Sequence, residues 1–448
     1  MATGAPLAEV LRAAAAVWVR VRDGQSLDRA LQDQALKHEV AAPIRAAVHA
    51  VSHDALRHCA LIEALLPRLI ARAPAPQVTG LLAAALSQLI VGAYRDHALV
   101  DQAVAAARSD RHLSATAGFV NAVLRSFLRR RAVLVPQLLL DDATRLNVPR
   151  WWLQRVRREH PEHWERALAC AVQPPALLLR VNRRRCDVDA YLARLRSEAV
   201  TARRVGPYAV RLDRPCPVQQ IPGFTEGVVS VQDAGAQLAA PWLQADDGMR
   251  VLDACAAPGG KTGHLAELSD ARIDAIELDP ARAGLITDNL QRLGLAAPRI
   301  RILTADARDV ASFWDGHPYQ RMLVDAPCTA SGIVRRHPDI PWLRREADVA
   351  QLTTLQAGLL DALWPLLAPA GRLLYVVCSV FREEADQQAD SFLERHPDAR
   401  LAPLPGTRHG WLQLLPTGAD PVEPGQTVGL PTEHDGFSLR CSRRSRPC

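Results

Sequence analysis

The chain has 448 residues, of which 48% are hydrophobic and 23% are charged, and its formal net charge is +6. This composition argues against a disordered or fibrous chain, and the length exceeds one ordinary core, so we expect two or three domains. Nine cysteines with no C-x-x-C spacing exclude a disulfide framework and a zinc ribbon, and they favour reduced thiols.

The N-terminal stretch predicts no signal peptide, because Glu9 and Arg12 interrupt its first apolar run. The longest uncharged stretch, residues 73–94, contains prolines and polar side chains, so we interpret its helical part as a buried helix rather than a membrane span. We therefore expect a cytoplasmic protein without a membrane segment.

Residues 1–142 predict an all-helical bundle, because apolar residues recur every three or four positions and β-branched alternation is scarce. Ser26 is a plausible N-cap for a helix with the sequence LDRALQDQALKH. The last helix of the bundle, FVNAVLRSFLRRR over 119–131, ends in several arginines. These arginines either complement the helix dipole or contact nucleic acid, and the sequence leaves both interpretations open.

Residues 143–226 contain shorter apolar runs with more proline and arginine, which predicts a small α/β linker domain. Trp151 and Trp152 stand among four arginines between positions 150 and 158. Such a cluster could stack on an RNA strand and clamp it. A tryptophan pair more often anchors a domain interface, and we favour that interpretation.

From residue 227 to the C-terminus, strand, turn and helix patterns alternate. Helices are expected over 280–294 and 347–368, and the segments 409–416 and 436–444 could add an antiparallel edge hairpin. This alternation predicts a Rossmann-like domain with a parallel, helix-covered sheet, and hence a multidomain α plus α/β protein. The expected strands are RVLDAC (250–255), RIDAIELD (272–279), RIRILTAD (299–306), RMLVDAPC (321–328) and GRLLYVVCS (371–379).

The stretch VLDACAAPGGKT (251–262) joins the first of these strands to a helix expected to begin near Thr262. It is not a Walker loop, because Cys255 occupies the position where that motif needs its first glycine, and the G-x-G-x-x-G signature is missing as well. A tight glycine turn at the carboxyl end of a strand still lets backbone amides approach a ligand.

Acidic residues end the strands of the predicted sheet. Glu277 is placed to accept the hydroxyls of a ribose, Asp306 to reach an adenine amine, and Asp325 ends the fourth strand. Acids at these positions without a triphosphate cradle favour S-adenosylmethionine over ATP or NAD. Cys255 is expected to line the cofactor pocket, and Lys261 could face the carboxylate of the cofactor.

Two thiols, Cys328 and Cys378, follow the fourth and fifth strands and should lie side by side near Asp325. A thiolate that adds to C6 of cytosine makes C5 nucleophilic enough to accept a methyl group, and a second thiol can assist release. The basic residues at 335–337 could raise the thiolate fraction. Asp325 could hold the N3/N4 edge of the base and protonate N3. Spacing alone does not rank the two thiols.

These motifs resemble the bacterial 16S ribosomal RNA cytosine-5 methyltransferase B family, also called Fmu or Sun. FVNAVLR (119–125) is similar to the NusB-type antitermination fold that this family carries at its N-terminus. The other stretches that carry the resemblance are VSVQDAGAQ (229–237), LDACAAPGGKT (252–262), DAPCTASGIVRRHPDIPWLRR (325–345) and VCSVFREEA (377–385).

The resemblance implies methylation of C5 of one 16S cytosine, position 967 in the usual rRNA numbering, with Cys378 as nucleophile and Cys328 assisting product release. Asp325 belongs to the cofactor set of the family as well as to our base-contact interpretation, and the sequence does not separate the two. The partner is 16S rRNA; we expect no metal and a monomer. The implied cofactor-binding residues are Cys255, Ala256, Ala257, Pro258, Gly259, Gly260, Lys261, Glu277, Asp306 and Asp325.

The chain departs from the family pattern in two places. Val377 replaces the usual threonine before the nucleophile, and Ala385 replaces the asparagine of Pro-Glu-Glu-Asn. Losing the asparagine removes a polar contact, which bears on substrate positioning more than on chemistry. Three other classes fit the sequence less well. A non-catalytic RNA-binding factor would not need the thiols or the glycine turn. An amino-group methyltransferase would carry Asn/Asp-Pro-Pro-aromatic instead of Asp-Ala-Pro-Cys after the fourth strand, and a DNA cytosine enzyme would use Cys328 as the nucleophile.

Overall fold

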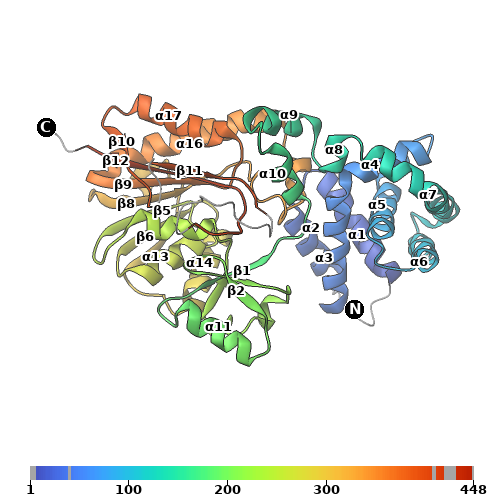
Figure 1. Ribbon diagram of the computed structural model, residues 1–448, viewed down its shortest axis with the longest axis horizontal. Helices are drawn as coiled ribbons and strands as arrows, with labels where there is room; N and C mark the ends of the chain where they lie inside the picture. Colours follow the sequence, from blue (N-terminus) through green and yellow to red (C-terminus); the bar gives the residue numbers. More distant parts are fainter. Residues whose placement is uncertain (1–6, 39–41, 406–409, 418–429, 446–448) are drawn as a thin grey trace. The chain divides into compact units, whose positions relative to one another are not determined.

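The computed structural model describes residues 7–38, 42–405, 410–417 and 430–445 (Figure 1). The chain divides into two compact units, the first comprising residues 1–173 with 334–345 and the second residues 174–333 with 346–448. The division expected from the sequence, with boundaries at 142 and 226, stays a prediction.

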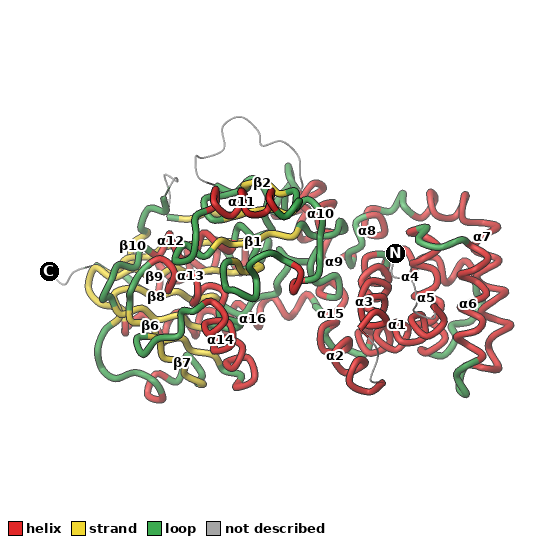
Figure 2. Tube along the Cα trace, turned by 90° about the horizontal axis from the view of Figure 1, so that it is seen from below, coloured by secondary structure: helices red, strands yellow, loops and turns green. Residues whose placement is uncertain are grey.

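The first unit is helical throughout its described residues, as predicted for residues 1–142 (Figure 2). Residues 143–173, which were assigned to the small α/β domain, also lie in this unit and form helices. The helix α2 has the predicted bounds, whereas the arginine-bearing helix α7 extends beyond them. The helices are α1 (Leu7–Arg22), α2 (Leu27–His38), α3 (Ala42–Arg57), α4 (Cys59–Leu69), α5 (Pro76–Val91), α6 (Asp96–Arg108), α7 (Ala117–Leu138), α8 (Asp142–Arg145), α9 (Arg150–Glu159), α10 (Trp164–Ala171) and α15 (Ile340–Leu343).

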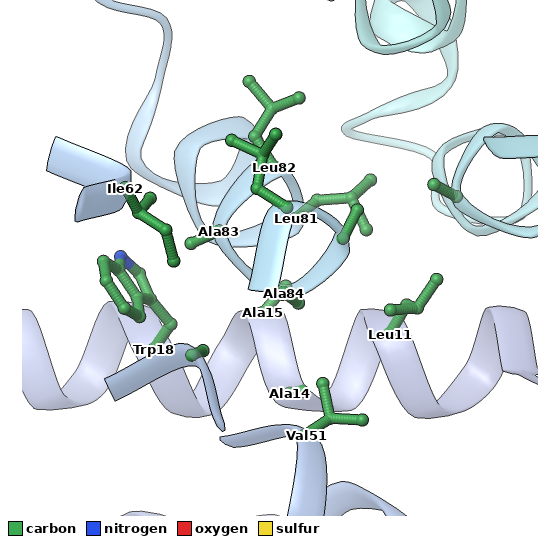
Figure 3. Packing of buried hydrophobic residues seen from close by; sticks show 14 of the residues in the cluster. Leu11, Ala14, Ala15, Trp18, Val51, Ile62, Leu81, Leu82, Ala83 and Ala84 are labelled. Atoms are coloured by element: carbon green, nitrogen blue, oxygen red, sulfur yellow. The ribbon is translucent and has the colours of Figure 1, made fainter. Parts of the chain in front are cut away.

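The core of this unit forms where α5 crosses α1 (Figure 3). Gly80 makes the close approach possible, because a Cβ atom at this position would lie 2.6 Å from the carbonyl oxygen of Ala15. Leu81 and Leu82 are fully buried, so α5 is the buried helix that the uncharged stretch predicted. Among the described residues, no helix is both long and apolar enough to cross a membrane.

The tryptophan and arginine cluster of α9 is structural. Trp152 is completely buried, so its ring cannot stack on an RNA base. Arg157 forms an ion pair with Asp142 at 2.6 Å, and Arg155 forms one with Glu159 at 2.9 Å. The burial of Trp152 argues against an RNA clamp built on that ring, and the anchoring of a domain interface stays a prediction.

The insertion 334–345 packs within the first unit, although it follows β8 in the sequence. Asp339 accepts a hydrogen bond from the backbone N–H of Leu27 at 2.9 Å, and Trp342 packs against the helical core. His337 lies 3.6 Å from Asp28. Of the basic residues at 335–337, expected beside the thiols, His337 thus contacts an acid of the helical unit, and the backbone carbonyl of Arg335 accepts a hydrogen bond from Arg57 of α3.

The second unit contains a small antiparallel sheet in the order β2-β3-β1-β4, with α11 (Val188–Ser197) packed on it. Its strand β4 lies past the expected boundary at 226. The strands are β1 (Leu177–Val181), β2 (Ala202–Arg204), β3 (Ala209–Leu212) and β4 (Val229–Val231).

The large sheet of the same unit has the order β10-β12-β9-β8-β5-β6-β7. Strands β5 to β9 are parallel, as predicted, and the chain order reverses between β5 and β8. Its strands are β5 (Arg250–Ala254), β6 (Arg272–Glu277), β7 (Ile300–Thr304), β8 (Tyr319–Asp325), β9 (Leu367–Val377), β10 (Ala399–Leu401), β11 (Trp411–Leu414) and β12 (Phe437–Arg444).

Helices cover both faces of this sheet: α16 and α17 lie on one face, and α13 and α14 lie on the other (Figure 1). Strands β11 and β12 pair antiparallel as expected, although residue 409 lies outside the described residues. They form the expected edge hairpin: β12 pairs with β9 on its inner side, and its outer side pairs with β11 and also with β10. The helices are α12 (Ala239–Leu243), α13 (Gly260–Leu268), α14 (Pro280–Leu293), α16 (Glu346–Leu363) and α17 (Asp386–Arg395).

Candidate active site

The glycine turn after β5 forms the floor of the site. Gly259 has φ +90°, and a Cβ atom there would lie 3.0 Å from the Cα of Ile286, so a larger residue would strain the backbone and clash with α14. Ala257 donates its backbone N–H to Glu277 at 3.2 Å, which links the turn to the end of β6. Helix α13 begins at Gly260, two residues before the expected start.

Two buried acids support this turn from below. Thr262 donates its hydroxyl to Asp253 at 2.6 Å, and burial raises the pKa of Asp253 to about 7. Arg180 of β1 is completely buried, donates to the carbonyl of Gly260 at 2.5 Å and pairs with Glu267 at 2.7 Å. The small sheet thereby fixes the start of α13.

A cavity of about 130 Å³ lies beside the turn and is lined by Cys255, Glu277 and Asp306 together with apolar side chains such as Leu278. Arg308 hydrogen-bonds the carboxylate of Asp306 and lowers its pKa, so Asp306 is ionised at neutral pH. Two carboxylates on apolar walls suit a purine nucleoside, whose hydroxyls and amine are donors and whose base is flat. The residues present therefore fit the adenosine part of S-adenosylmethionine.

Lys261 and Asp325 form an ion pair at 2.5 Å between the turn and the end of β8. Burial lowers the pKa of Lys261, but the charge and hydrogen bond of Asp325, together with the nearby Cys378 and Asp253, outweigh it, so the pKa lies above its ordinary value and the ammonium is charged. Cys378 is among the groups that act electrostatically on this ammonium. Lys261 is therefore a cation close to Cys378.

The structure brings Cys328 and Cys378 together, with their sulfur atoms 3.4 Å apart. Cys328 is buried, whereas Cys378 is partly exposed. The hydrogen bond to Cys378 and burial raise the pKa of Cys328 well above its ordinary value, so Cys328 keeps its proton. A protonated thiol thus lies in hydrogen-bonding contact with a more accessible sulfur.

A buried carboxylate, Glu384, ties the two cysteine loops together. It accepts hydrogen bonds from the hydroxyl of Thr329 at 2.5 Å and from the hydroxyl of Ser379 at 2.6 Å. Thr329 follows Cys328 and Ser379 follows Cys378, so a single acid fixes the separation of the two sulfurs. Gln356 of α16 donates to the same carboxylate at 3.1 Å.

Sequence reasoning missed both Arg180 and Glu384. Glu384 stood only in a stretch noted for departing from a family motif, and a local pattern does not reveal that a charged side chain is buried. Val377 and Ala385, the two departures themselves, are completely buried. Within the described ranges, no group of three or more metal-ligating side chains is placed to hold an ion.

The reversed strand order, the glycine turn and the acids at the strand ends define a doubly wound α/β domain of the methyltransferase type. Three family models match the chain: the 16S rRNA methyltransferase RsmB/F at residues 240–429, an RsmF/B-like ferredoxin-like domain at 148–219 and the NusB family at 9–129. These matches confirm the expected fold class and the resemblance noted from the motifs.

Curated relatives match almost the whole chain. The ribosomal RNA small subunit methyltransferase B of Salmonella typhi is 38% identical over 91% of this chain and 95% of its own length. The protein of the same name from Salmonella arizonae is 38% identical over 95% of this chain and 96% of its own. The chain therefore belongs to the ribosomal RNA small subunit methyltransferase B family.

Solved structures share the fold. PH0851 superposes with a TM-score of 0.77 at 23% identity, covering 97% of this chain and 99% of its own. A methyltransferase homologue from Pyrococcus horikoshii gives a TM-score of 0.55 at 25% identity, covering 68% of this chain and 98% of its own. NSun6 from the same organism, solved with SFG, gives 0.57 at 16% identity, covering 67% of this chain and 99% of its own.

Proposed function

We propose that the protein transfers a methyl group from S-adenosylmethionine to C5 of a cytosine in 16S rRNA, cytosine 967 in the usual numbering, through a covalent bond between Cys378 and C6. The observation that carries this proposal is the pair of thiols 3.4 Å apart beside the Lys261–Asp325 ion pair. An amino-group methyltransferase has no use for two thiols in this position.

The cofactor assignment is supported by the lining of the cavity. Glu277 would accept the ribose hydroxyls, Asp306 would accept from the adenine amine, and the turn from Cys255 to Lys261 would face the methionine end. When bound, S-adenosylmethionine supplies an electrophilic methyl group on its sulfonium. The relative NSun6 was solved with SFG, an analogue of this cofactor, which is consistent with the assignment.

The order of the two thiols is supported by their surroundings as well as by the family. Cys378 is the more exposed sulfur, and it is close enough to the ammonium of Lys261 to act on it electrostatically. Cys328 is buried and keeps its proton, so it can donate a hydrogen bond but is a poor nucleophile. We therefore assign Cys378 as the nucleophile and Cys328 as the residue that assists release.

The reaction follows from these roles. The Cys378 thiolate forms a bond to C6, and the electrons of the C5–C6 double bond shift toward C5 as Asp325 holds the N3/N4 edge of the base. C5 takes the methyl group and then loses its proton to solvent water. The C6–sulfur bond breaks as the double bond re-forms, and the S–H of Cys328 stabilises the departing thiolate by a hydrogen bond.

Two single substitutions test the assignment. We expect Cys378→Ser to lower methylation by more than about 10³-fold, because the nucleophile is lost. Cys328→Ser should accumulate a protein–RNA adduct, seen as a shifted band on a denaturing gel. An adduct with Cys378→Ser instead would assign the nucleophile to Cys328, as in DNA cytosine enzymes.

The product is checked by mass spectrometry of 16S rRNA incubated with the protein and isotopically labelled S-adenosylmethionine. The proposal requires 5-methylcytosine at a single position, and a label on any other base or atom would refute it.

We also propose that the protein acts as a monomer in the cytoplasm. Analytical ultracentrifugation should then give a mass near 48.9 kDa.

A further inference from the structure

Arginines line the amino end of the large sheet, opposite the thiols. Arg250 begins β5 and Arg272 begins β6, and the same end of every other strand in the sheet path also carries an arginine. Four of these arginines lie in the four neighbouring strands β8, β9, β12 and β10, which form one half of the sheet. We call these four the arginine row: Arg321, Arg372, Arg443 and Arg400.

The register of the sheet places the members of the arginine row directly opposite one another. Arg321 pairs with Arg372, Arg372 pairs with Arg443, and Arg443 pairs with Arg400. Paired residues point to the same face, about 5 Å apart, and like charges in this position repel. Burial first, and then the charges of Arg372 and Arg443, lower the pKa of Arg321, which shows that the guanidinium groups act on one another.

Carboxylates do not neutralise this row. Among the described residues, no aspartate or glutamate forms an ion pair with any of the four arginines. Asp246 is near enough to raise the pKa of Arg321 by its charge, but it makes no ion pair with this residue. Arg321 and Arg400 donate to backbone carbonyls instead. The Nη1 atom of Arg372 is buried and has no hydrogen-bond partner in the described part of the chain.

The other half of the same sheet end is different. Arg250 is held by Asp315 at 2.9 Å, Arg301 by Asp274 at 2.6 Å, and Arg299 contacts Asp270 at 3.2 Å. An arginine-rich composition alone would not separate the two halves in this way. Arg272 of this half forms no ion pair among the described residues either, but it lines a cavity together with Asp274 and Asp315. The two halves therefore differ in the acids that surround their arginines.

A cavity of about 430 Å³ opens along the arginine row. Among the described residues, Arg372, Arg400, Arg443 and Arg444 line it, and no acidic residue does. Arg444 is paired with Asp398 at 3.1 Å, so the unpaired charge belongs to the other three. Cys378 follows Arg372 by six residues along β9, which places the row about 20 Å from the thiols. A ligand here would lie far from the reacting base.

We propose that the arginine row binds consecutive phosphates of the ribosomal RNA, at a distance from the target cytosine. This inference rests on the proposed rRNA substrate. A line of equally spaced cations fits a polyanion better than a single anion, because each phosphate meets its own guanidinium. The row would hold the flanking RNA while the carboxyl end of the sheet takes the base.

The test uses the two exposed members, so that the fold is preserved. We expect Arg400→Gln combined with Arg443→Gln to weaken binding of a fluorescent 16S rRNA fragment about tenfold near 0.1 M salt. The slope of log affinity against log salt should fall in magnitude by about 1 to 2. Affinity for S-adenosylmethionine and the rate at saturating RNA should not change.

The matched control is Arg272→Gln combined with Arg299→Gln, which removes the same charge from the half that contains acids. This control should bind RNA within about twofold of the unchanged protein. Equal weakening in both double variants, or in neither, overturns the arginine row as a binding site. Formation of 5-methylcytosine is measured separately, so failure of the row is distinguishable from failure of the proposed reaction.

Discussion

The two ends of the large sheet present opposite chemistry. At the carboxyl end, carboxylates and thiols lie in a compact, largely buried site held together by specific hydrogen bonds, such as those from Thr329 and Ser379 to Glu384. At the amino end, exposed arginines such as Arg400 and Arg443 face solvent without an acidic partner among the described residues. Parallel strands place their carboxyl ends at one edge of the sheet and their amino ends at the opposite edge, so the same topology gathers the site residues at one edge and the arginines at the other.

The difference has an energetic consequence. Buried hydrogen-bonded groups depend on one another, so a single change at the carboxyl end should disturb the whole site. Screened surface charges act almost independently, so changes at the amino end should be small, additive and dependent on salt. The predictions below test this contrast, beginning with the largest expected effect.

Arg180→Met should cost the second unit about 3–5 kcal/mol, because it leaves Glu267 buried without its partner and releases the carbonyl of Gly260. Calorimetric unfolding should show this loss, and affinity for S-adenosylmethionine should fall with it. Arg184→Met is the control, because Arg184 pairs with Asp270 at the surface and should cost less than about 1 kcal/mol. Equal losses in the two variants would contradict a special role for the buried pair.

Glu384→Gln should lower kcat about 10²-fold with little change in KM, because the new amide N–H groups face donors and the two cysteine loops separate. The thiols offer a second readout that does not depend on catalysis. Diamide should oxidise the Cys328–Cys378 pair quickly in the unchanged protein and slowly in the variant. Glu383→Gln, which changes the neighbouring carboxylate, should leave both measurements unaltered, and an unchanged oxidation rate in Glu384→Gln would rule out the positioning role.

Asp253 should make stability depend on pH. Its pKa is raised to about 7 in the folded protein, so the folded state binds the proton more tightly than the unfolded chain, whose aspartate titrates near 3.9. The stabilisation is complete below about pH 4 and is lost as the pH rises through about 7. Asp253→Asn should therefore be more stable than the unchanged protein at pH 8, by about 2–4 kcal/mol, and of similar stability at about pH 4, where the aspartate is protonated in both states. Parallel stability curves for the two proteins would contradict this.

The smallest effect is expected from a single change in the arginine row. Arg443→Gln alone should weaken RNA binding only about threefold, and its effect should add to that of Arg400→Gln in the double variant. At the carboxyl end, Ser379→Ala combined with Glu384→Gln should cost much less than the sum of the single changes. If the effects of Arg443→Gln and Arg400→Gln on RNA binding do not add, the two arginines act as one structured site and the expected independence of the surface charges is wrong.

Much of the fold was accessible from local pattern. The helix Leu27–His38 and the parallel strands β5 to β9 follow from apolar periodicity and turn residues, because these depend on neighbours close in the chain. The thiol pair was accessible for the same reason: Cys328 and Cys378 each follow a strand, and adjacent parallel strands end together. The sequence shows which residues follow a strand, and the parallel topology then predicts that these residues lie at the same edge of the sheet.

Other features depended on contacts between distant segments. Arg180 reaches Glu267 across 87 positions, and Thr329 reaches Glu384 across 55, with no local sign that these side chains are buried. The insertion 334–345 packs in the helical unit, although its sequence lies between two elements of the sheet unit. The arginine row required the register of β12 against β9 and β10, because pairing decides which side chains share a face, and pairing is selected by the packing of the whole sheet.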